Sequence, residues 1–291
     1  MRGKVLVVYD DSIGEEEFIS KNKLLIDAAK ENNITLAFKS NSDLYTYIDN
    51  NNVKGNDTYG TYNYCLFFNK DAYLAKNLEM MGVKVVNCSK AINLCENKAN
   101  MYQELTKTNI NIPKTVIFPT HGTINSKKTA DFLQNAINDL GLPVVVKGFF
   151  GGTGNNVYLA RTKEQLMQIV EKMNGFQVLI QEYILESSGT DIRVFVIKNK
   201  VIAAIRRQGS AGDFRSNVGL GGSMTKHIPT YTEEQLAINA AKQVGCDFAI
   251  VDILKSINGP VVCEVNTTAN VNNFYKICDV NIPELLFKTI K

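Results

Sequence analysis

Two carboxylates occur in the segment AIVDILKSINGPVVCEVN, Asp252 in its first apolar run and Glu264 in its second. Apolar runs on either side of a polar turn are typical of a β-hairpin. A two-residue turn at Asn258 and Gly259 would put the carboxylates on opposite faces, because side chains alternate along a strand. A loop of three or five residues would pair them directly, and the three-residue loop favours a left-handed glycine, which Gly259 can supply.

The directly paired register places three oxygen-bearing side chains, Asp252, Glu264 and Asn266, on one face of the hairpin. Opposed carboxylates repel each other unless a cation lies between them. Carboxylate and amide oxygens are ligands that Mg²⁺ prefers, and Mn²⁺ accepts the same kind of ligand. The hairpin alone leaves two interpretations open: a divalent metal site, or two acids on a solvated strand face.

A glycine-rich turn follows an apolar strand in VVVKGFFGGTGNNV, with Lys147 at the end of that strand. Gly151, Gly152 and Gly154 let backbone N–H groups approach a phosphate closely, and the lysine supplies positive charge. The segment lacks the G-K-[ST] ending of a Walker loop, and a strand follows it where a Rossmann fingerprint has a helix. It predicts either a phosphate-binding loop or a hairpin turn beside a chance lysine.

Polar side chains also lie in VLIQEYILESSGTDIRVFVI, namely Gln181, Glu182, Asp191 and Arg193. An adenine ring could hydrogen-bond to the backbone where this strand meets its loop, and Glu182 or Asp191 could hold ribose hydroxyls. A linker that carries surface charges is the alternative interpretation.

The segment IRRQGSAGDFRSNVGLGG carries Arg206, Arg207 and Arg215 among small residues. The planar guanidinium group is the preferred partner of phosphate and carboxylate. Three arginines in a glycine-rich loop after an apolar strand favour an anion site over a solvated loop.

Composition narrows the classes of function. The chain has 291 residues, 45% of them hydrophobic, and a formal net charge of +3. It has no basic block and no long apolar run, so we expect neither a nucleic-acid partner nor a membrane partner. Six cysteines without a C-x-x-C pair indicate reduced thiols in a cytoplasmic protein. With only two histidines, catalysis would depend on carboxylates, lysine, arginine and backbone groups.

Strands and helices alternate in the first third of the chain, which predicts a parallel sheet with helices on both faces. The expected strands cover residues 4–10, 34–40, 64–69 and 83–89, and the expected helices cover 22–32 and 71–82. We expect the asparagine-rich residues 49–63 to form a surface loop.

After about residue 95 the pattern changes to antiparallel hairpins mixed with helices, which indicates α+β domains. The expected helices cover residues 98–108, 129–141, 163–175, 232–245 and 282–290. The expected strands cover 114–119, 143–149, 155–160 and 178–184, followed by a hairpin over 191–208 and the acidic hairpin.

The order of these motifs resembles the ATP-grasp superfamily, and within it the RimK-type carboxylate–amine (glutamate) ligases. The resemblance is densest from residue 143 to residue 266, where QEYI, DIRVFV, AAIRR, GDFRSN, VDIL and GPVVCEVN are similar to the family pattern. It implies an ATP-grasp fold with an N-terminal parallel α/β domain and two lobes that enclose the nucleotide. The implied boundaries are 1–95 for the N-terminal domain, 96–183 for the central lobe and 184–291 for the C-terminal lobe.

The resemblance also implies a role for each matching residue, with ATP and Mg²⁺ (or Mn²⁺) bound in the cleft. Lysines would contact the phosphates, residues 182 and 183 the adenine, and Asp191 the ribose. The implied nucleotide-binding residues are Lys98, Lys147, Gly151, Gly152, Gly154, Gln181, Glu182, Tyr183, Ile184 and Asp191. The implied metal ligands are Asp252, Glu264 and Asn266, and the arginines at the γ-phosphate or the substrate carboxylate are Arg193, Arg206 and Arg215.

The reaction that the resemblance implies activates a carboxylate as an acylphosphate and joins it to an amine. Glutamate or another amino acid would be added to a peptide, a protein tail or a small molecule. The alternative is a catalytically silent ATP-binding module on the same fold. The chain could also form a homo-oligomer.

Three departures from the family pattern bear on the choice of acceptor. TTANVNN follows E-V-N where the family has small residues that end in Pro-Gly. Asn156 stands at the second glycine position of the phosphate loop, and Leu220 replaces a basic residue before a pair of glycines. The metal ligands are intact.

Overall fold

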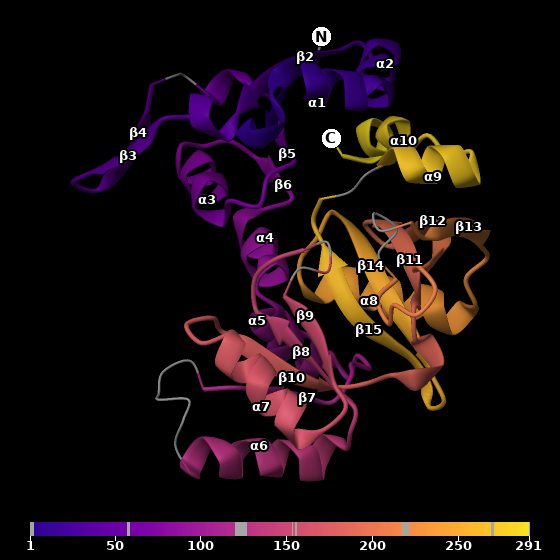
Figure 1. Ribbon diagram of the computed structural model, residues 1–291. Helices are drawn as coiled ribbons and strands as arrows, with labels where there is room; N and C mark the ends of the chain where they lie inside the picture. The colour runs from indigo at the N-terminus through magenta and orange to yellow at the C-terminus, as the bar shows by residue number, and fades with distance from the viewer. Residues whose placement is uncertain are drawn as a thin grey trace.

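The computed structural model describes residues 3–56, 59–119, 127–152, 154, 156–216, 221–268 and 271–290. These residues form three larger β-sheets and one two-stranded hairpin, and the chain builds the three larger sheets one after another (Figure 1). The first sheet is parallel, whereas the second and third are antiparallel. The predicted combination of α/β and α+β architecture is therefore confirmed.

The first sheet is parallel throughout and has the order β2-β1-β5-β6. Side chains of β1 enter two separate cores, one with the helices α1 and α2 and the other with α3, so the strand is an unbroken apolar run. The strands are β1 (Gly3–Tyr9), β2 (Ile34–Ser40), β5 (Tyr64–Phe67) and β6 (Val85–Val86), and the helices are α1 (Glu15–Lys21), α2 (Lys23–Glu31) and α3 (Ala72–Met80).

The predicted surface loop at residues 49–63 is wrong in its first part. Strands β3 (Thr46–Asp49) and β4 (Asn52–Gly55) form an antiparallel hairpin there, which projects from the first sheet (Figure 1). Asn50 in its turn has a left-handed backbone, with φ at 51°. Asparagine tolerates that conformation, so the asparagines belong to a tight hairpin turn. Residues 57 and 58 lie outside the described residues.

The second sheet has the order β7-β10-β8-β9, and two helices cover one of its faces. Val144 and Val146 of β8 point toward these helices, so the alternate residues Val145 and Lys147 point to the other face, where they line a pocket. The strands are β7 (Thr115–Ile117), β8 (Val144–Gly148), β9 (Val157–Ala160) and β10 (Val178–Glu182). The helices are α6 (Lys127–Leu140) and α7 (Lys163–Lys172), and α4 (Ser89–Glu96) and α5 (Lys98–Leu105) come before the sheet.

The third sheet has the order β13-β12-β11-β14-β15. Helix α8 covers one face, and α9 and α10 pack near the other, beside the first sheet (Figure 1). Leu286 and Phe287 of α10 share a core with Leu25 and Ala28 of α2. The strands are β11 (Thr190–Ile197), β12 (Lys200–Gln208), β13 (Ser223–His227), β14 (Phe248–Ser256) and β15 (Gly259–Asn266), and the helices are α8 (Tyr231–Gln243), α9 (Val271–Cys278) and α10 (Ile282–Thr289).

Asn87, directly after β6, links the first sheet to the third. Its Nδ2 donates to the carbonyls of Phe248 and Thr267 at 2.9 and 3.2 Å. Its Oδ1 accepts from the N–H groups of Asp247 and Phe248 at 2.8 and 3.1 Å. The fully buried amide thus holds the start of β14 and the end of β15 against the parallel sheet.

Two global features accompany this architecture. Within the described ranges, no helix is both long enough and apolar enough to cross a bilayer. All six cysteines are free thiols.

Candidate active site

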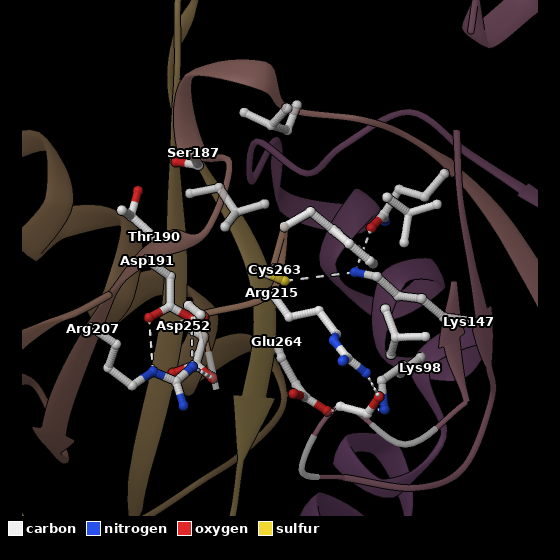
Figure 2. A pocket seen from close by; sticks show the side chains of 18 of the residues that line it. Lys98, Lys147, Ser187, Thr190, Asp191, Arg207, Arg215, Asp252, Cys263 and Glu264 are labelled. Atoms are coloured by element: carbon white, nitrogen blue, oxygen red, sulfur yellow. Dashed lines mark hydrogen bonds and ion pairs between the residues drawn. The ribbon is translucent and has the colours of Figure 1, made fainter. Parts of the chain in front are cut away.

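A pocket lies between the second and third sheets and contains nearly all of the predicted site residues (Figure 2). The glycine-rich loop, β8 and the end of β10 form one wall, and β11, β12, β14 and β15 form the other. Lys98 reaches the pocket from α5. The charged side chains of the pocket thus come from separate elements and face one another between the two sheets.

The acidic hairpin has the predicted pairing of Asp252 with Glu264, although its turn differs from the prediction. The turn holds two residues, Ile257 and Asn258, and without a bulge it would pair Asp252 with Cys263. A β-bulge at Cys263 shifts the register by one residue. Both carboxylates line the pocket as a result.

Helix α5 supports this bulge through a side-chain hydrogen bond. Tyr102 Oη donates to the Cys263 carbonyl at 2.6 Å. A bulged residue leaves the ladder, so its backbone groups need partners elsewhere. Burial raises the pKa of Tyr102 to about 12, so the phenol remains a protonated donor at neutral pH.

Lys98, the first residue of α5, connects the glycine-rich loop to the acidic hairpin. Its Nζ lies 3.0 Å from Glu264 Oε1 and donates to the Gly151 carbonyl at 2.8 Å. The side chain of Asn97 caps α5 by accepting from the N–H groups of Ala99 and Asn100. This cap fixes the start of the helix at Lys98. The helix start therefore aims a buried positive charge into the pocket.

Lys147 is a second buried lysine of the pocket. Its Nζ donates to Gln181 Oε1 at 2.7 Å and lies 3.6 Å from Cys263 Sγ (Figure 2). Burial opposes the ammonium charge, but Cys263, Tyr102 and Glu264 nearby outweigh burial and raise the pKa of Lys147 above the usual lysine range. Lys147 is therefore charged at neutral pH.

Two arginines and two aspartates form an ion network on the third sheet. Figure 2 labels Arg207, Asp191 and Asp252 of this network. Arg193 donates to both oxygens of Asp252 at 2.8 and 2.7 Å. Arg207 donates to the Asp191 carboxylate and also reaches Asp252 Oδ2 at 3.1 Å. The pairing of the strands explains the cluster, because Asp191 lies opposite Arg207 and Arg193 lies opposite Asp252.

The network also controls the charge of Asp252. Burial alone would raise the pKa of Asp252, but Arg193 and Arg207 outweigh burial and lower it. Asp252 is therefore an ionised carboxylate at neutral pH, with its two oxygens held by guanidinium groups.

The donor set of Asp252, Glu264 and Asn266 fits a divalent cation such as Mg²⁺, because it offers two carboxylates and an amide oxygen in one pocket. Asn266 Nδ2 is buried and has no hydrogen-bond partner among the described residues, so the amide can turn its oxygen toward the pocket. The described part of the chain holds no metal-binding group of three His, Cys, Asp or Glu residues. A site here therefore needs the asparagine.

The glycine-rich loop is held from the third sheet as well. Gly151 and Gly154 have left-handed backbones, with φ at 114° and 80°. Arg215 Nη1 donates to the Gly154 carbonyl at 3.2 Å, and its Nη2 pairs with Asp213 at 2.8 Å. Gly154 thus contacts Arg215, which lines the pocket from the segment between β12 and β13.

The end of β10 forms the other border of the pocket. The Glu182 N–H donates to the Lys114 carbonyl at 3.0 Å, and Glu182 Oε1 accepts from the Lys114 N–H at 2.7 Å. The ring of Tyr183 meets Phe214 edge to face, with centroids 6.3 Å apart. These contacts hold Glu182 and Tyr183 at the border of the pocket.

Comparison with known proteins identifies the family. Residues 95–290, more than half of the chain, match the model of the RimK-like ATP-grasp domain. The chain belongs to the RimK-like ATP-grasp family. The probable alpha-L-glutamate ligase of Maridesulfovibrio salexigens is 38% identical over 220 residues, which cover 75% of this chain and 70% of the relative. The probable alpha-L-glutamate ligase of Vibrio atlanticus is 37% identical over 221 residues, with the same coverage.

Solved structures carry the same ATP-grasp fold. A RimK domain ATP-grasp protein of Sphaerobacter thermophilus is 18% identical with a TM-score of 0.73, over 99% of both chains. The D-alanine–D-alanine ligase of Bacillus anthracis complexed with ATP is 17% identical with a TM-score of 0.72, over 99% of this chain and 96% of the other. The predicted ATP-grasp fold is confirmed. The chain is an ATP-dependent ligase that joins a carboxylate to an amine, and the silent-module alternative receives no support.

The pocket of this RimK-like ATP-grasp ligase brings together fifteen of the predicted site residues. They are Lys98, Lys147, Gly151, Gly152, Gly154, Gln181, Glu182, Tyr183, Ile184, Asp191, Arg193, Arg215, Asp252, Glu264 and Asn266.

Arg206 is the exception, and the structure places it outside the pocket. Its side chain is exposed, whereas that of the next residue, Arg207, is buried and lines the pocket. Neighbouring side chains on a strand point to opposite faces, so only one of the two arginines can face the site. The prediction of Arg206 is therefore wrong. The pairing of Asp191 with Arg207 across the hairpin distinguishes the two arginines.

Asp191 lies in the pocket but is not free to hold a ribose. Its carboxylate accepts from Arg207 and from Ser216 Oγ, the latter at 2.6 Å. Its contacts are those of a residue that positions Arg207.

The sequence did not predict a role for Cys263 and Tyr102. Their role depends on the β-bulge in β15, and this bulge has no sequence signature.

Two of the departures from the RimK-like pattern can be placed. Asn156 has φ at 57°, a left-handed conformation that asparagine tolerates, so the loop keeps a glycine-like backbone at this position. Thr267, the first residue after E-V-N, is buried, and its Oγ1 has no partner among the described residues. Leu220 lies outside the described residues.

Proposed function

We propose that this ATP-grasp ligase adds an amino acid, with glutamate as the first candidate, to the carboxylate of a peptide, a protein tail or a small molecule. The observation that carries the proposal is the meeting of Lys98, Lys147 and Arg193 with the carboxylates of Asp252 and Glu264 in one pocket. The alpha-L-glutamate ligase relatives support glutamate as the added amino acid.

The nucleotide would lie along the glycine-rich loop. Lys147 is charged and Lys98 is already bonded to the Gly151 carbonyl, so both ammonium groups stand where a triphosphate would pass. Backbone N–H groups of the loop can add hydrogen bonds to the phosphate oxygens, since glycine allows close approach. The segment at residues 182–184, directly at the end of β10, would receive the adenine ring.

Asp252, Glu264 and Asn266 would hold Mg²⁺ or Mn²⁺. When bound, the metal would supply positive charge to the triphosphate and orient it for phosphoryl transfer. The ion network has a separate role, because Asp191 and Ser216 hold Arg207, and Arg207 holds Asp252 in place.

The reaction proceeds in two steps that need no protein nucleophile. An oxygen of the substrate carboxylate attacks the γ-phosphorus, the bond to the bridging oxygen breaks, and ADP leaves an acylphosphate behind. The amine nitrogen then attacks the acyl carbon, phosphate leaves, and the nitrogen loses a proton to give the amide. Arg193 and Arg215 stabilise the negative charge that develops on the transferred group.

The test uses the purified protein with ATP, MgCl₂ and a panel of amino acids, each with and without a carboxylate-bearing peptide. We expect phosphate release that depends on both an amino acid and an acceptor, and a peptide mass increased by one or more glutamate residues. Phosphate release without any mass increase, for every amino acid, would contradict the proposal.

A cytoplasmic location belongs to the same proposal. It is supported by the free thiols of all six cysteines, which persist in a reducing compartment.

A further inference from the structure

The acidic side chains of the pocket are already paired with cations of the same chain. Glu264 Oε1 lies 3.0 Å from Lys98 Nζ, and the Lys98 side chain is only 9% exposed. Asp252 accepts from Arg193 at 2.7 and 2.8 Å and from Arg207 at 3.1 Å. Both carboxylates that we assign to the metal therefore carry internal counter-ions, Asp252 on both oxygens and Glu264 on Oε1.

These counter-ions differ in how firmly they are held. Arg207 is also bonded to Asp191, so leaving its place would strand a second buried acid. Among the described residues, Arg193 has no acidic partner other than Asp252, and Lys98 has none other than Glu264. Lys98 can therefore leave Glu264, and Arg193 can leave Asp252, for another anion. Arg207 remains bonded to Asp191 and Asp252.

The charge of the pocket as a whole favours anions. Five basic side chains line it against four acidic ones, and Glu182, one of the acids, is turned toward the Lys114 N–H at the pocket border. A free divalent cation would have to compete with an ammonium group at Glu264 and with guanidinium groups at Asp252. A triphosphate reverses this balance, because lysine and arginine bind phosphate oxygens well.

We propose that Lys98 and Arg193 act as internal counter-ions that keep a divalent cation off Glu264 and Asp252 until a triphosphate draws them away. Nucleotide binding then exposes the metal ligands, so the metal binds tightly only with or after the nucleotide. The inference rests on the metal ligands of the proposed function and adds to them an order of binding that two named ion pairs impose.

The test measures metal binding directly, by electron paramagnetic resonance of free Mn²⁺ in titrations of the nucleotide-free protein. We expect wild type to bind Mn²⁺ weakly and Lys98→Met to bind it at least about tenfold more tightly, since a neighbouring positive charge is gone. Lys107→Met is the matched control: it removes a lysine that pairs with Glu104 at 2.6 Å close to the other end of α5. It should bind Mn²⁺ as wild type does.

Arg193→Met provides a second measurement that does not depend on the folding of Lys98→Met. Arg207 remains on Asp252 in this variant, and Mn²⁺ affinity should again rise about tenfold. Equal Mn²⁺ affinity in wild type and in both single variants overturns the inference.

The double variant Lys98→Met/Glu264→Gln separates this inference from the proposed function. Loss of the gained Mn²⁺ binding in the double variant supports both. Persistence of the gain places the cation elsewhere and overturns the ligand assignment together with the inference. If neither single variant gains affinity, yet Glu264→Gln abolishes Mg²⁺-dependent turnover, the ligand assignment stands and the counter-ion inference alone is overturned.

Discussion

Lys147 and Arg207 illustrate how a buried charge is kept in this pocket. Each is surrounded by groups that favour its charged form: Cys263, Tyr102 and Glu264 around the lysine, Asp252 and Asp191 around the arginine. In both cases these neighbours outweigh burial and raise the pKa of the base. The two cations are therefore permanent features of the site at neutral pH.

Replacing Lys147 should weaken nucleotide binding without altering the rest of the loop. Lys147→Met keeps the apolar stem and removes the ammonium, and we expect a loss of about 1.5–3 kcal/mol in ATP binding free energy, the scale of a charge-assisted hydrogen bond. Isothermal titration calorimetry measures this loss. Lys163→Met is the control, because its Nζ bonds to Gln134 Oε1 at 2.8 Å, on the helices behind the sheet. An unchanged Kd for ATP in Lys147→Met would remove this lysine from the site.

The adjacent arginines 206 and 207 offer a matched pair of substitutions. Arg207→Lys keeps the charge but loses the planar fork that bonds to Asp191 and Asp252, so we expect at least about a tenfold loss of turnover and about 1–3 kcal/mol of stability. Arg206→Lys, on the exposed side, should leave both unchanged. ATP-dependent phosphate release and urea unfolding measure the two effects. Equal losses in both variants would contradict the assignment of faces on β12.

At the scale of elements, the bulge in β15 is what turns an ordinary hairpin into a site. It brings Glu264 opposite Asp252 and leaves the Cys263 carbonyl to Tyr102 of α5. The bulge therefore depends on a helix that lies more than a hundred and fifty residues earlier in the chain. Substitutions on that helix should be felt in the pocket.

Tyr102→Phe tests this dependence. It leaves the buried carbonyl of Cys263 without its donor, and we expect a loss of about 1–3 kcal/mol in unfolding free energy and weaker Mg²⁺-dependent stabilisation by ATP. Urea unfolding with and without the nucleotide and metal measures both. Tyr73→Phe, at an 84% exposed tyrosine on α3, is the control and should change neither. A Tyr102→Phe protein as stable as wild type would show that the bulge forms without the phenol.

Helix α8 has a capping box whose strength depends on pH. Thr230 accepts from the Glu233 N–H at 3.3 Å, and Glu233 Oε2 accepts from the Thr230 N–H at 2.8 Å and contacts His227 Nε2 at 2.9 Å. Burial alone would raise the pKa of Glu233, but these partners outweigh burial and lower it. The ionised form is thus bound more favourably in the folded chain than in the unfolded chain.

A depressed acid pKa stabilises the fold above the unfolded value of about 4.3, and this stabilisation is lost as pH falls through the folded pKa. Glu233→Gln should therefore be less stable than wild type by about 1 kcal/mol at pH 7, and the difference should shrink as pH falls below about 4.3 and vanish below the folded pKa. Urea unfolding at a series of pH values measures it. A difference that shows no decline as pH falls below about 4.3 would mean that the cap does not depend on the charge.

Helices and strands could be predicted where the pattern of apolar residues was strong. They could not be predicted where turn residues or contacts with distant segments define the element. The sequence predicted β1, β8 and β14 from their apolar runs and α8 from its helical spacing of apolar residues, because burial requires these patterns. The hairpin β3–β4 was hidden by asparagines that serve as turn residues. Helices α1, α4 and α9 and strand β13 were not anticipated, and the short apolar stripe of α4 depends on neighbours distant in the chain.

At the scale of the whole molecule, the three sheets form one body through a few polar contacts as well as apolar cores. Asn87 is the clearest case, since its one amide group bonds to residues 247, 248 and 267. Nothing in the sequence distinguishes it from the many other asparagines, because its partners come together only after all three sheets are built.

Asn87→Leu should therefore uncouple the sheets. It leaves buried backbone groups of β14 and the end of β15 unpaired, at a cost of roughly 2–4 kcal/mol. We expect the first sheet and the third to unfold in separate transitions in urea, followed by tyrosine fluorescence and circular dichroism. Asn22→Leu is the control, because its Nδ2 bonds within its own helical segment, to the Phe18 carbonyl. A single cooperative transition with wild-type midpoint in Asn87→Leu would contradict this role.

The packing of α10 against α2 has a consequence for synthesis on the ribosome. Leu25 and Ala28 share their core with Leu286 and Phe287, so this core cannot close while the segment that forms α10 is still in the exit tunnel. The N-terminal sheet, which emerges early, must wait with part of its apolar surface open. Nascent chains arrested before residue 282 should therefore be cleaved by protease within the first sheet and bind chaperones, and release of the full chain should end both.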